Sequence, residues 1–329
     1  MITPGKRIVA FGGGHGLAAS LRALRQLRTG LGLDITAVVT VADDGGSSGR
    51  LRADRGGLPP GDLRQALAAL ADPADPVGTQ TAELWQYRFD GNDPLAGHAV
   101  GNLLLHGLME MIDDPVVALD RAASMVRAVG RVLPMSPAPV GIEADVRGLG
   151  LVHGQHSVAV ARGVVEEVRL TPTHPPACAE ALAAIRDADW LIFGPGSWYT
   201  SVIPHLLVPD LAAAIAASPA RRVVCLNLAL ERETAGMSLP DHLRALARYL
   251  PGLRVDVVLA DGKVAVDPIG LETAAQSLGA RVVLAPVAVA DGGPRHDPVA
   301  LALALQAVLT APNEPHNPEQ TREVTTRWR

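Results

Sequence analysis

The feature that most constrains the fold is a regular alternation of short apolar runs with helical segments. Residues 7–11 (RIVAF) and 35–41 (ITAVVTV) are typical of buried strands, and residues 17–28 between them carry apolar side chains at helical spacing. A strand–helix–strand crossover of this kind places its two strands parallel in one sheet. Because the alternation resumes after residue 176, we predict an α/β fold with a Rossmann-like, doubly wound and mostly parallel sheet.

The middle of the chain departs from this alternation. Residues 131–170 are rich in Val and Gly and lack helical periodicity, which favours short antiparallel strands in a small β-meander on one sheet edge. With the helices before it, this stretch makes an insertion at about 77–170 in a single domain, residues 1–311. Residues 312–329 have little apolar content and are predicted to be a disordered tail. Further helices are expected at 61–71, 77–89, 98–111, 115–129, 176–186, 209–217, 239–249 and 297–310, and further strands at 190–193, 222–226, 255–259 and 281–285.

Charge and composition exclude several classes of protein. Lys and Arg number 29 and Asp and Glu 34, so the net charge is −5, which argues against a broad nucleic-acid footprint but not against one anion held by local arginines. The two cysteines, Cys178 and Cys225, match no zinc spacing. No segment resembles a signal peptide or a membrane span, so we expect a cytoplasmic protein; a homo-oligomer remains open.

The first candidate ligand contact is a glycine-rich turn directly after the first predicted strand, formed by Gly12, Gly13, Gly14 and Gly16. Glycines let the backbone approach a ligand closely, and the N-terminus of the following helix favours an anion. Leu17 stands where a dinucleotide fingerprint has its third glycine, so the pattern gives little support to NAD. The alternative interpretation is a tight turn that binds nothing.

A second glycine-rich segment, residues 43–49 (DDGGSSG), follows the second predicted strand, and we expect a loop there. Ligands of open α/β sheets collect at this end of the strands. The acidic pair could accept hydrogen bonds from ribose or hold Mg²⁺, the loop N–H groups could form an anion nest, and an arginine could clamp a phosphate. A solvated surface loop is the alternative. The candidate contacts are Asp43, Asp44, Ser47, Ser48 and Arg50.

A rigid turn at Pro59 and Pro60 leads into the next predicted helix. Asp62 lies in the first turn of that helix and could simply cap it. Arg64 could face either the site or the solvent, and the sequence does not decide between the two.

His98 and Asn102 are four residues apart and share one face of a predicted helix. Asn102 could read the edge of a base or a sugar, and His98 could act as an acid or a base. A histidine near a helix start is more commonly structural, so Asn102 is the stronger candidate.

The last candidate segment follows the predicted strand 190–193. Its Gly-Pro-Gly turn, hydroxyl side chains and helix start are typical of a phosphate cradle, although an ordinary capped turn has the same composition. It lacks the lysine of a Walker loop, so ATP hydrolysis is not expected. At the switch point of a doubly wound sheet this segment would meet the earlier loops. The candidate contacts are Gly194, Gly196, Ser197, Thr200 and Ser201.

Several of these segments together resemble a known family. VAFGGGHGLAASLRAL, ITAVVTVADDGGSSGRLR, GGLPPGDLRQALAALAD, YRF, GHAVGNLLL and FGPGSWYTSVIPHLLV are similar, in order, to the YvcK-type gluconeogenesis factors and their CofD homologues over about residues 7–260. The resemblance implies a Rossmann-like fold. YvcK-type members are associated with growth on gluconeogenic carbon sources, cell shape and UDP-sugar binding, whereas CofD-type members transfer a phospholactyl group to a deazaflavin.

The resemblance also assigns functional positions, and VADDGGSSGRLR is closer to the YvcK branch. It points to the glycines at 12–14 and 16, to Asp43 and Asp44, to Asn102, and to Gly194, Gly196, Ser197 and Thr200. The chain departs from the family pattern at His15, Trp198 and His205, where Thr, Leu and Asn are usual, and at residues 227–234, which lack a Pro-Gly turn.

Three functions follow as hypotheses. The first is a binding regulator that holds a UDP-sugar, with phosphates on the Gly14 and Gly196 loops and ribose on Asp44. The second is a CofD-like 2-phospho-L-lactate transferase, in which Asp43 or Asp44 holds Mg²⁺ and Asn102 orients a deazaflavin acceptor. The third, an NAD-dependent oxidoreductase, is disfavoured because the dinucleotide fingerprint is incomplete.

Overall fold

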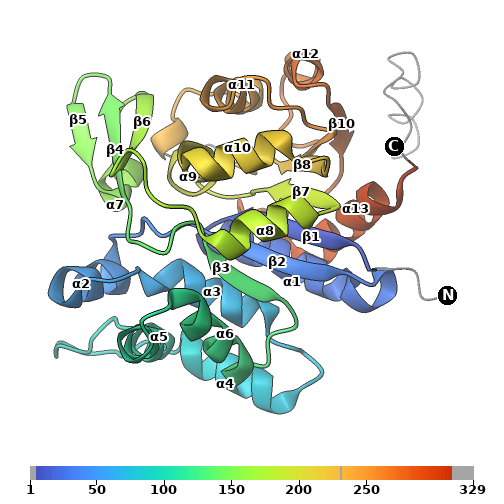
Figure 1. Ribbon diagram of the computed structural model, residues 1–329. Coiled ribbons are helices and arrows are strands. Elements are labelled where there is room, and N and C mark those ends of the chain that lie inside the picture. The colour runs from blue at the N-terminus through green and yellow to red at the C-terminus, as the bar shows by residue number, and fades with distance from the viewer. Residues whose placement is uncertain (1–4, 230–231, 313–329) are drawn as a thin grey trace.

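The computed structural model describes residues 5–229 and 232–312, and its centre is a sheet of seven parallel strands in the order β10-β9-β8-β7-β1-β2-β3 (Figure 1). The chain builds outward from β1 to β3 on one side and from β7 to β10 on the other. This is the doubly wound arrangement predicted from the sequence. The strands are β1 (Arg7–Gly12), β2 (Asp34–Val39), β3 (Arg131–Pro134), β7 (Trp190–Phe193), β8 (Arg221–Cys225), β9 (Val257–Ala260) and β10 (Arg281–Leu284).

The strand register aligns the carboxyl ends of the three central strands. Phe11 of β1 pairs with Val38 of β2 and with Phe193 of β7. The rings of Phe11 and Phe193 stack with centroids 4.8 Å apart. The loops that follow β1, β2 and β7 therefore start at the same edge of the sheet, where a doubly wound fold binds its ligands.

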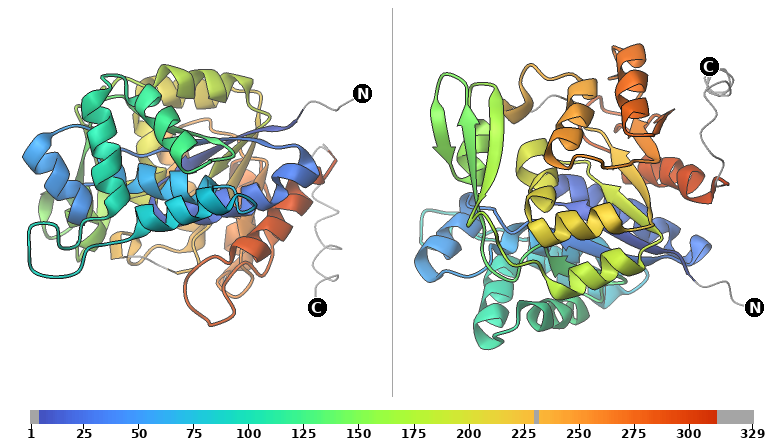
Figure 2. Two further views of the ribbon diagram at one scale, coloured as in Figure 1. Left: turned by 90° about the horizontal axis from the view of Figure 1, so that it is seen from below. Right: turned by 45° about the horizontal axis from the view of Figure 1, so that its top comes forward.

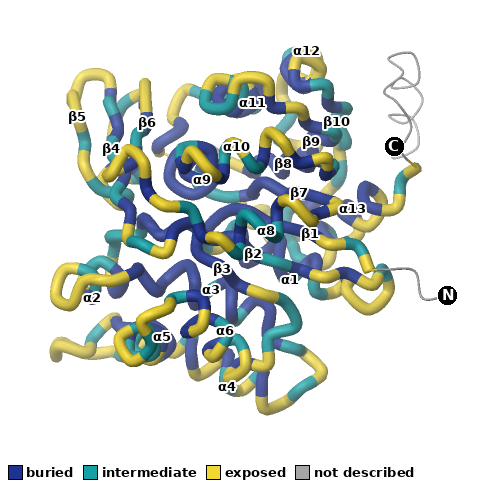
Figure 3. Tube along the Cα trace, in the orientation of Figure 1, coloured by how far each residue is buried: buried dark blue, intermediate teal, exposed yellow. Residues whose placement is uncertain are grey.

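Helices cover both faces of the sheet, and buried residues concentrate between the layers (Figures 2 and 3). Leu17, Leu21 and Leu24 recur at helical spacing and bury one side of α1 (Gly14–Leu31). α1 packs against α3 (Pro60–Leu70) and α13 (Pro298–Thr310), while α8 (Ala179–Asp187) and α10 (Pro209–Ala217) pack together over the opposite face.

A helical layer lies beside α3, beyond the β3 edge of the sheet. Its predicted helices are confirmed as α4 (Pro76–Gln86), α5 (Val100–Met111) and α6 (Pro115–Met125). Asp75 and Asp114 cap α4 and α6 by accepting hydrogen bonds from the first N–H groups of those helices. The loop predicted at residues 43–49 is instead shorter, because helix α2 (Gly46–Arg55) begins within it.

The segment 131–170 differs from its prediction in two ways. Its first four residues form β3, which pairs in parallel with β2 and belongs to the main sheet. The remaining strands form a separate antiparallel sheet in the order β5-β4-β6, with β4 in the middle, so the chain does not make a simple meander. These elements are β4 (Gly141–Val146), β5 (Gly150–His153), the short helix α7 (Gln155–Val160) and β6 (Val165–Thr171).

The second half of the chain completes the sheet and its covering helices. Within the described ranges, no helix combines the length and the apolar character needed to cross a membrane. Residues 313–329 of the predicted tail lie outside the described residues. The remaining elements are a π-helix η1 (Trp198–Val202), α9 (Pro204–Leu207), a 3₁₀ turn η2 (Arg232–Thr234), α11 (Leu239–Tyr249) and α12 (Pro268–Ser277).

Candidate functional site

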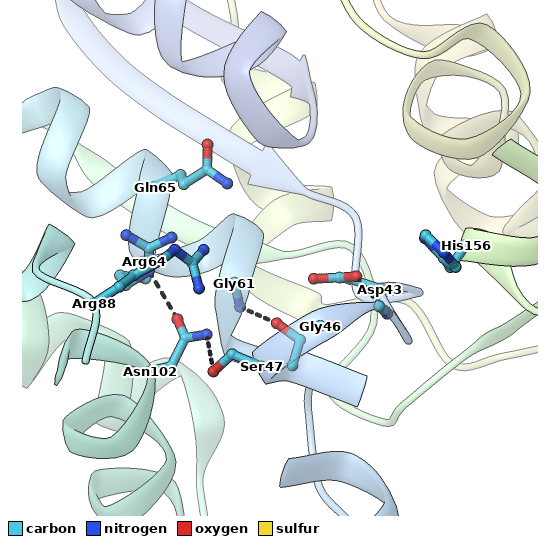
Figure 4. Close-up of a pocket in the computed structure, with 11 residues that line it drawn as sticks. Asp43, Gly46, Ser47, Gly61, Arg64, Gln65, Arg88, Asn102 and His156 are labelled. Atoms are coloured by element: carbon cyan, nitrogen blue, oxygen red, sulfur yellow. Dashed lines mark hydrogen bonds between the residues drawn. The ribbon is translucent and has the colours of Figure 1, made fainter. Parts of the chain in front are cut away.

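A pocket of about 350 Å³ opens beside the carboxyl end of β2 (Figure 4). Segments far apart in the sequence build it: the turn after β2, the N-terminal ends of α2 and α3, the start of α5, and the start of α7. Its size is at the small end of the range for ligand pockets. The lining residues are Asp43, Gly45, Gly46, Ser47, Ser48, Gly61, Arg64, Gln65, Arg88, Asn102 and His156.

A chain of hydrogen bonds crosses the floor of the pocket. Asn102 Nδ2 donates to Ser47 Oγ at 2.9 Å, so the Ser47 hydroxyl is left to donate to His98 Nδ1, also 2.9 Å away. At the other end, Arg64 Nε donates to Asn102 Oδ1 at 2.7 Å and Arg64 Nη1 donates to Gln86. All of these side chains except Gln86 are buried. This network of hydrogen bonds fixes the Arg64 guanidinium in one orientation.

Asp43 lies across the pocket from the arginines, and a second carboxyl, that of Asp62, lies near it (Figure 4). Asp43 follows β2 and accepts a hydrogen bond from the Gly45 N–H at 3.0 Å. Asp62, in the first turn of α3, is 9% exposed, and burial together with the nearby Asp43 raises its pKa to about 7. A buried carboxyl in electrostatic contact with a half-buried one favours holding either a proton or a cation.

Asp62 also occupies the first glycine-rich turn. Its carboxyl accepts a hydrogen bond from the Gly14 N–H, at the N-terminus of α1. A Cβ added to Gly13 would lie only 2.3 Å from Asp62 Oδ2. The protein's own carboxyl therefore lies where we expected a ligand phosphate, since an acidic group is what a helix N-terminus favours.

Basic groups gather on the other side. Arg64 is only 2% exposed, and burial together with the neighbouring Arg88 lowers its pKa to about 10. The pKa of His15 at the start of α1 is lowered by burial and then by Arg22, Arg64 and Arg88. In Figure 4 the guanidinium groups of Arg64 and Arg88 lie side by side. Like charges crowd here, and they repel one another unless an anion lies between them.

The glycine-rich turns after β1 and β7 contact each other directly at the switch point. A Cβ added to Gly16 would lie 2.2 Å from the carbonyl oxygen of Pro195, so only glycine permits this approach. The second turn is held by Asn227, whose Oδ1 accepts from the Gly196 N–H and whose Nδ2 donates to the Gly196 carbonyl. This N–H is consequently already used within the protein.

Two of the three candidate hydroxyl residues in the turn after β7 lie in the interior, whereas Ser197 is half-buried. Thr200 and Ser201 are buried, and Thr200 Oγ1 has no hydrogen-bond partner among the described residues. The Ser197 carbonyl accepts the N–H of Ser201 at the start of η1. Gly194 is held through its carbonyl, which accepts from Ser20 Oγ at 2.9 Å. None of these residues lines the pocket.

The contacts predicted in the segment after β2 separate into two groups. Asp43, Ser47 and Ser48 line the pocket, together with Asn102 from α5. Asp44 instead accepts a hydrogen bond from the His156 N–H at 2.8 Å and so ties the small sheet's helix to the pocket rim. Arg50 donates to the Ala96 carbonyl, where its exposed side chain braces the loop before α5.

Several pocket residues were not among the candidate contacts predicted from the sequence. Gly61 lines the pocket, its N–H donates to Ser48 Oγ, and a Cβ there would lie 2.4 Å from that oxygen. Gln65, Arg88 and His156 also line it. The only sequence signal for Gln65 was its place beside Arg64 in the turn of α3, and Arg88 and His156 reach the pocket only through tertiary packing.

Two departures from the family pattern lie in the core. His205 is fully buried, with Nε2 3.0 Å from the Val38 carbonyl oxygen, and burial lowers its pKa to about 4. Trp198 is equally buried and meets the ring of His242 edge-on at 5.1 Å. Both substitutions therefore change packing beside the switch point and leave the pocket lining unaltered.

The fold and the pocket define a Rossmann-like protein with a charged, ligand-sized cavity at the carboxyl end of its parallel sheet. The family model described as 2-phospho-L-lactate transferase CofD matches residues 8–286. The chain thus belongs to the CofD family, as its motifs indicated.

Individual relatives bear a different name. A protein of Mycobacterium tuberculosis provisionally named a gluconeogenesis factor is 50% identical over 92% of this chain and 90% of its own length. The gluconeogenesis factor of Bacillus subtilis is 37% identical over 80% of this chain and 81% of its own length. A crystal structure of a UPF0052 family protein from Bacillus halodurans superimposes with a TM-score of 0.83 at 34% identity, covering 92% of this chain and 99% of that one.

Proposed function

We propose that this protein binds a nucleotide-sugar of the UDP-sugar class and acts as a cytoplasmic regulator of growth on gluconeogenic carbon sources and of cell shape. The observation that carries the binding proposal is the pocket itself, with Arg64 and Arg88 on one side and Asp43 on the other at the carboxyl end of a doubly wound sheet. The names of the relatives support the gluconeogenic role. UDP-sugar binding and cell shape rest on the family resemblance.

The proposal distributes the ligand over the site by chemistry. The diphosphate would lie against Arg64, Arg88 and the N-terminus of α2, since these present cationic and N–H donors. Gln65 and Asn102 would contact sugar or ribose hydroxyls, as amide side chains both donate and accept. A cavity of about 350 Å³ does not enclose a whole nucleotide-sugar, so the base would extend toward the glycine-rich turns.

Magnesium fits the acidic side as an accompanying ion. Asp43 and Asp62 offer carboxyl oxygens, and a cation would relieve the repulsion by Asp43 that, after burial, raises the pKa of Asp62. Within the described residues no group of three or more acidic, His or Cys side chains could hold a metal. Two carboxylates, with water and ligand phosphates completing the shell, are what Mg²⁺ commonly accepts. The ion would neutralise phosphate charge.

The proposal is tested by thermal shift and calorimetry on the purified protein. The ligands are UDP-N-acetylglucosamine, UDP-glucose, GDP, GTP and NAD, each with and without magnesium. A ligand that binds only the native state raises the unfolding midpoint by mass action. We expect a shift with UDP-sugars, strengthened by magnesium, and none with NAD. A response confined to guanine nucleotides would overturn the UDP-sugar assignment.

The second candidate is a CofD-like transfer of a phospholactyl group to a deazaflavin. The observation that favours it is Asp62, whose pKa of about 7 lets it accept a proton near neutral pH beside the proposed magnesium position. The family model bears the transferase name. The test is to incubate the protein with a nucleotide-activated phospholactate and a deazaflavin and to analyse the mixture by mass spectrometry. Formation of the phospholactyl-deazaflavin product would establish transferase activity. Absence of product although the donor binds would favour the binding regulator.

A further inference from the structure

We propose that Arg64, Arg88 and the N-terminus of α2 form a distinct oxyanion subsite, which binds inorganic pyrophosphate by itself and takes the diphosphate of a larger ligand. The inference rests on the proposed function only in its second part. Its first part concerns the chemistry of the pocket alone and holds whatever base or sugar the ligand carries.

The first observation is a buried guanidinium with an unused donor. Arg64 is 2% exposed and lines the pocket. Its Nε and Nη1 donate to Asn102 and Gln86, while Nη2 makes no hydrogen bond with the described residues. Neither Arg64 nor Arg88 forms an ion pair in the described part of the chain. A buried cation without an acidic partner is costly, and a bound anion removes that cost.

The second observation is the convergence of cations. Arg88 lowers the pKa of Arg64, and both lower the pKa of His15, so the three groups share one electrostatic environment. Asp62 and Asp43 raise the pKa of Arg64, and each of them acts more weakly than Arg88. Two guanidinium groups therefore gather on this side of the pocket, although the whole chain carries a net charge of −5.

The third observation is the helix end that faces the arginines. Helix α2 starts with Gly45 at its N-cap, which provides no side-chain cap, and Gly46, Ser47 and Ser48 line the pocket. The first N–H groups of a helix have no partner within it and attract anions. Ser47 is held by Asn102, which also holds Arg64, so both donor sets are positioned by one side chain.

The experiment is isothermal titration calorimetry with inorganic pyrophosphate, inorganic phosphate and UDP, without magnesium. Arg88→Gln removes one guanidinium at an exposed position, so the fold is expected to survive. The matched control is Arg121→Gln, an exposed arginine of α6 outside the pocket. Loss of a charge-assisted contact predicts about 10- to 100-fold weaker pyrophosphate binding in Arg88→Gln and no change in the control. Arg88→Lys should recover only part of this.

The outcomes separate the subsite from the nucleotide-sugar proposal. Pyrophosphate binding that depends on Arg88, without any UDP-sugar binding, supports the subsite and rejects the UDP-sugar assignment. Equal weakening of pyrophosphate and UDP supports both. The subsite is overturned if wild-type protein fails to bind pyrophosphate at millimolar concentration, or if Arg88→Gln and Arg121→Gln bind it equally. Phosphate binding as tight as that of pyrophosphate would identify a single-phosphate site and overturn the diphosphate assignment.

Discussion

At the scale of single residues, Asp62 shows how the surroundings of a side chain change its hydrogen-bond partner and its pKa. A carboxyl in the first turn of a helix ordinarily caps or flanks that helix. Here it lies at the N-terminus of a different helix, accepts the Gly14 N–H, and has a pKa of about 7 because it is buried beside Asp43. Asp62 is thus the group whose protonation most directly couples the stability of the site to pH.

The sign of this coupling gives a prediction. Because the folded-state pKa lies above the unfolded value, the folded state holds its proton between about pH 4 and 7, and the stability this provides is lost as pH rises through about 7. Asp62→Asn mimics the protonated form. We expect its urea midpoint, relative to wild type, to increase from about pH 5 to about pH 8 in EDTA. Parallel pH profiles for the two proteins would show that Asp62 has an ordinary pKa.

At the scale of elements, the turns after β1 and β7 can pack closely because Gly16 has no side chain between them. Gly16 in α1 meets the backbone of Pro195 and Gly196, where a Cβ would be 2.2 and 2.7 Å from the nearest atoms. Backbone atoms cannot rotate away as the end of a side chain can. The switch point is therefore closed by direct backbone packing between the two halves of the sheet.

Substituting Gly16 should separate these turns. Overpacking against backbone predicts that Gly16→Ala loses about 1–3 kcal/mol of unfolding free energy. Gly30 is the matched control in the same helix, because a Cβ there would meet nothing within 4 Å. Gly30→Ala should gain about 0.5–1 kcal/mol from helix propensity. Urea unfolding of both variants tests this, and a stable Gly16→Ala protein would mean that the turns are not in direct contact.

The starts of the helices show which elements the local sequence can predict. Helix α12 was not predicted, although Asp267-Pro268 at its start matches Asp75-Pro76 and Asp297-Pro298. In all three the Asp side chain caps the helix and Pro occupies its first turn. By contrast, nothing local marks residues 131–134 as a strand of the main sheet, because parallel pairing with β2 is a long-range choice.

At the scale of the whole molecule, the two sheets share one core. Val146, Val168 and Leu170 of the small sheet belong to the same buried cluster as Ile8 and Phe193 of the large one. A continuous core means that the small sheet cannot lose its packing without exposing apolar surface elsewhere. The prediction of one domain over residues 1–311 is therefore a prediction of one cooperative transition.

Urea unfolding tests that cooperativity. Trp85 lies in α4, within the predicted insertion, and Trp190 lies in β7 of the main sheet, both buried. The fluorescence transitions of Trp85→Phe and Trp190→Phe, each compared with far-UV circular dichroism of the same variant, should coincide. An earlier transition reported only when Trp85 is present would reveal a separately folding unit at about 77–170.

The sequence by itself determined the doubly wound sheet, most of its helices and the family, because apolar periodicity and glycine-rich turns are local and act over a few residues. Four of the contacts it predicted, Asp43, Ser47, Ser48 and Asn102, follow a strand or begin a helix, and they line the pocket. Only the tertiary structure decided what surrounds them. Asp62 occupies the expected phosphate position, and Arg88 and His156 enter from distant segments, because burial and charge at a site are sums over the whole fold.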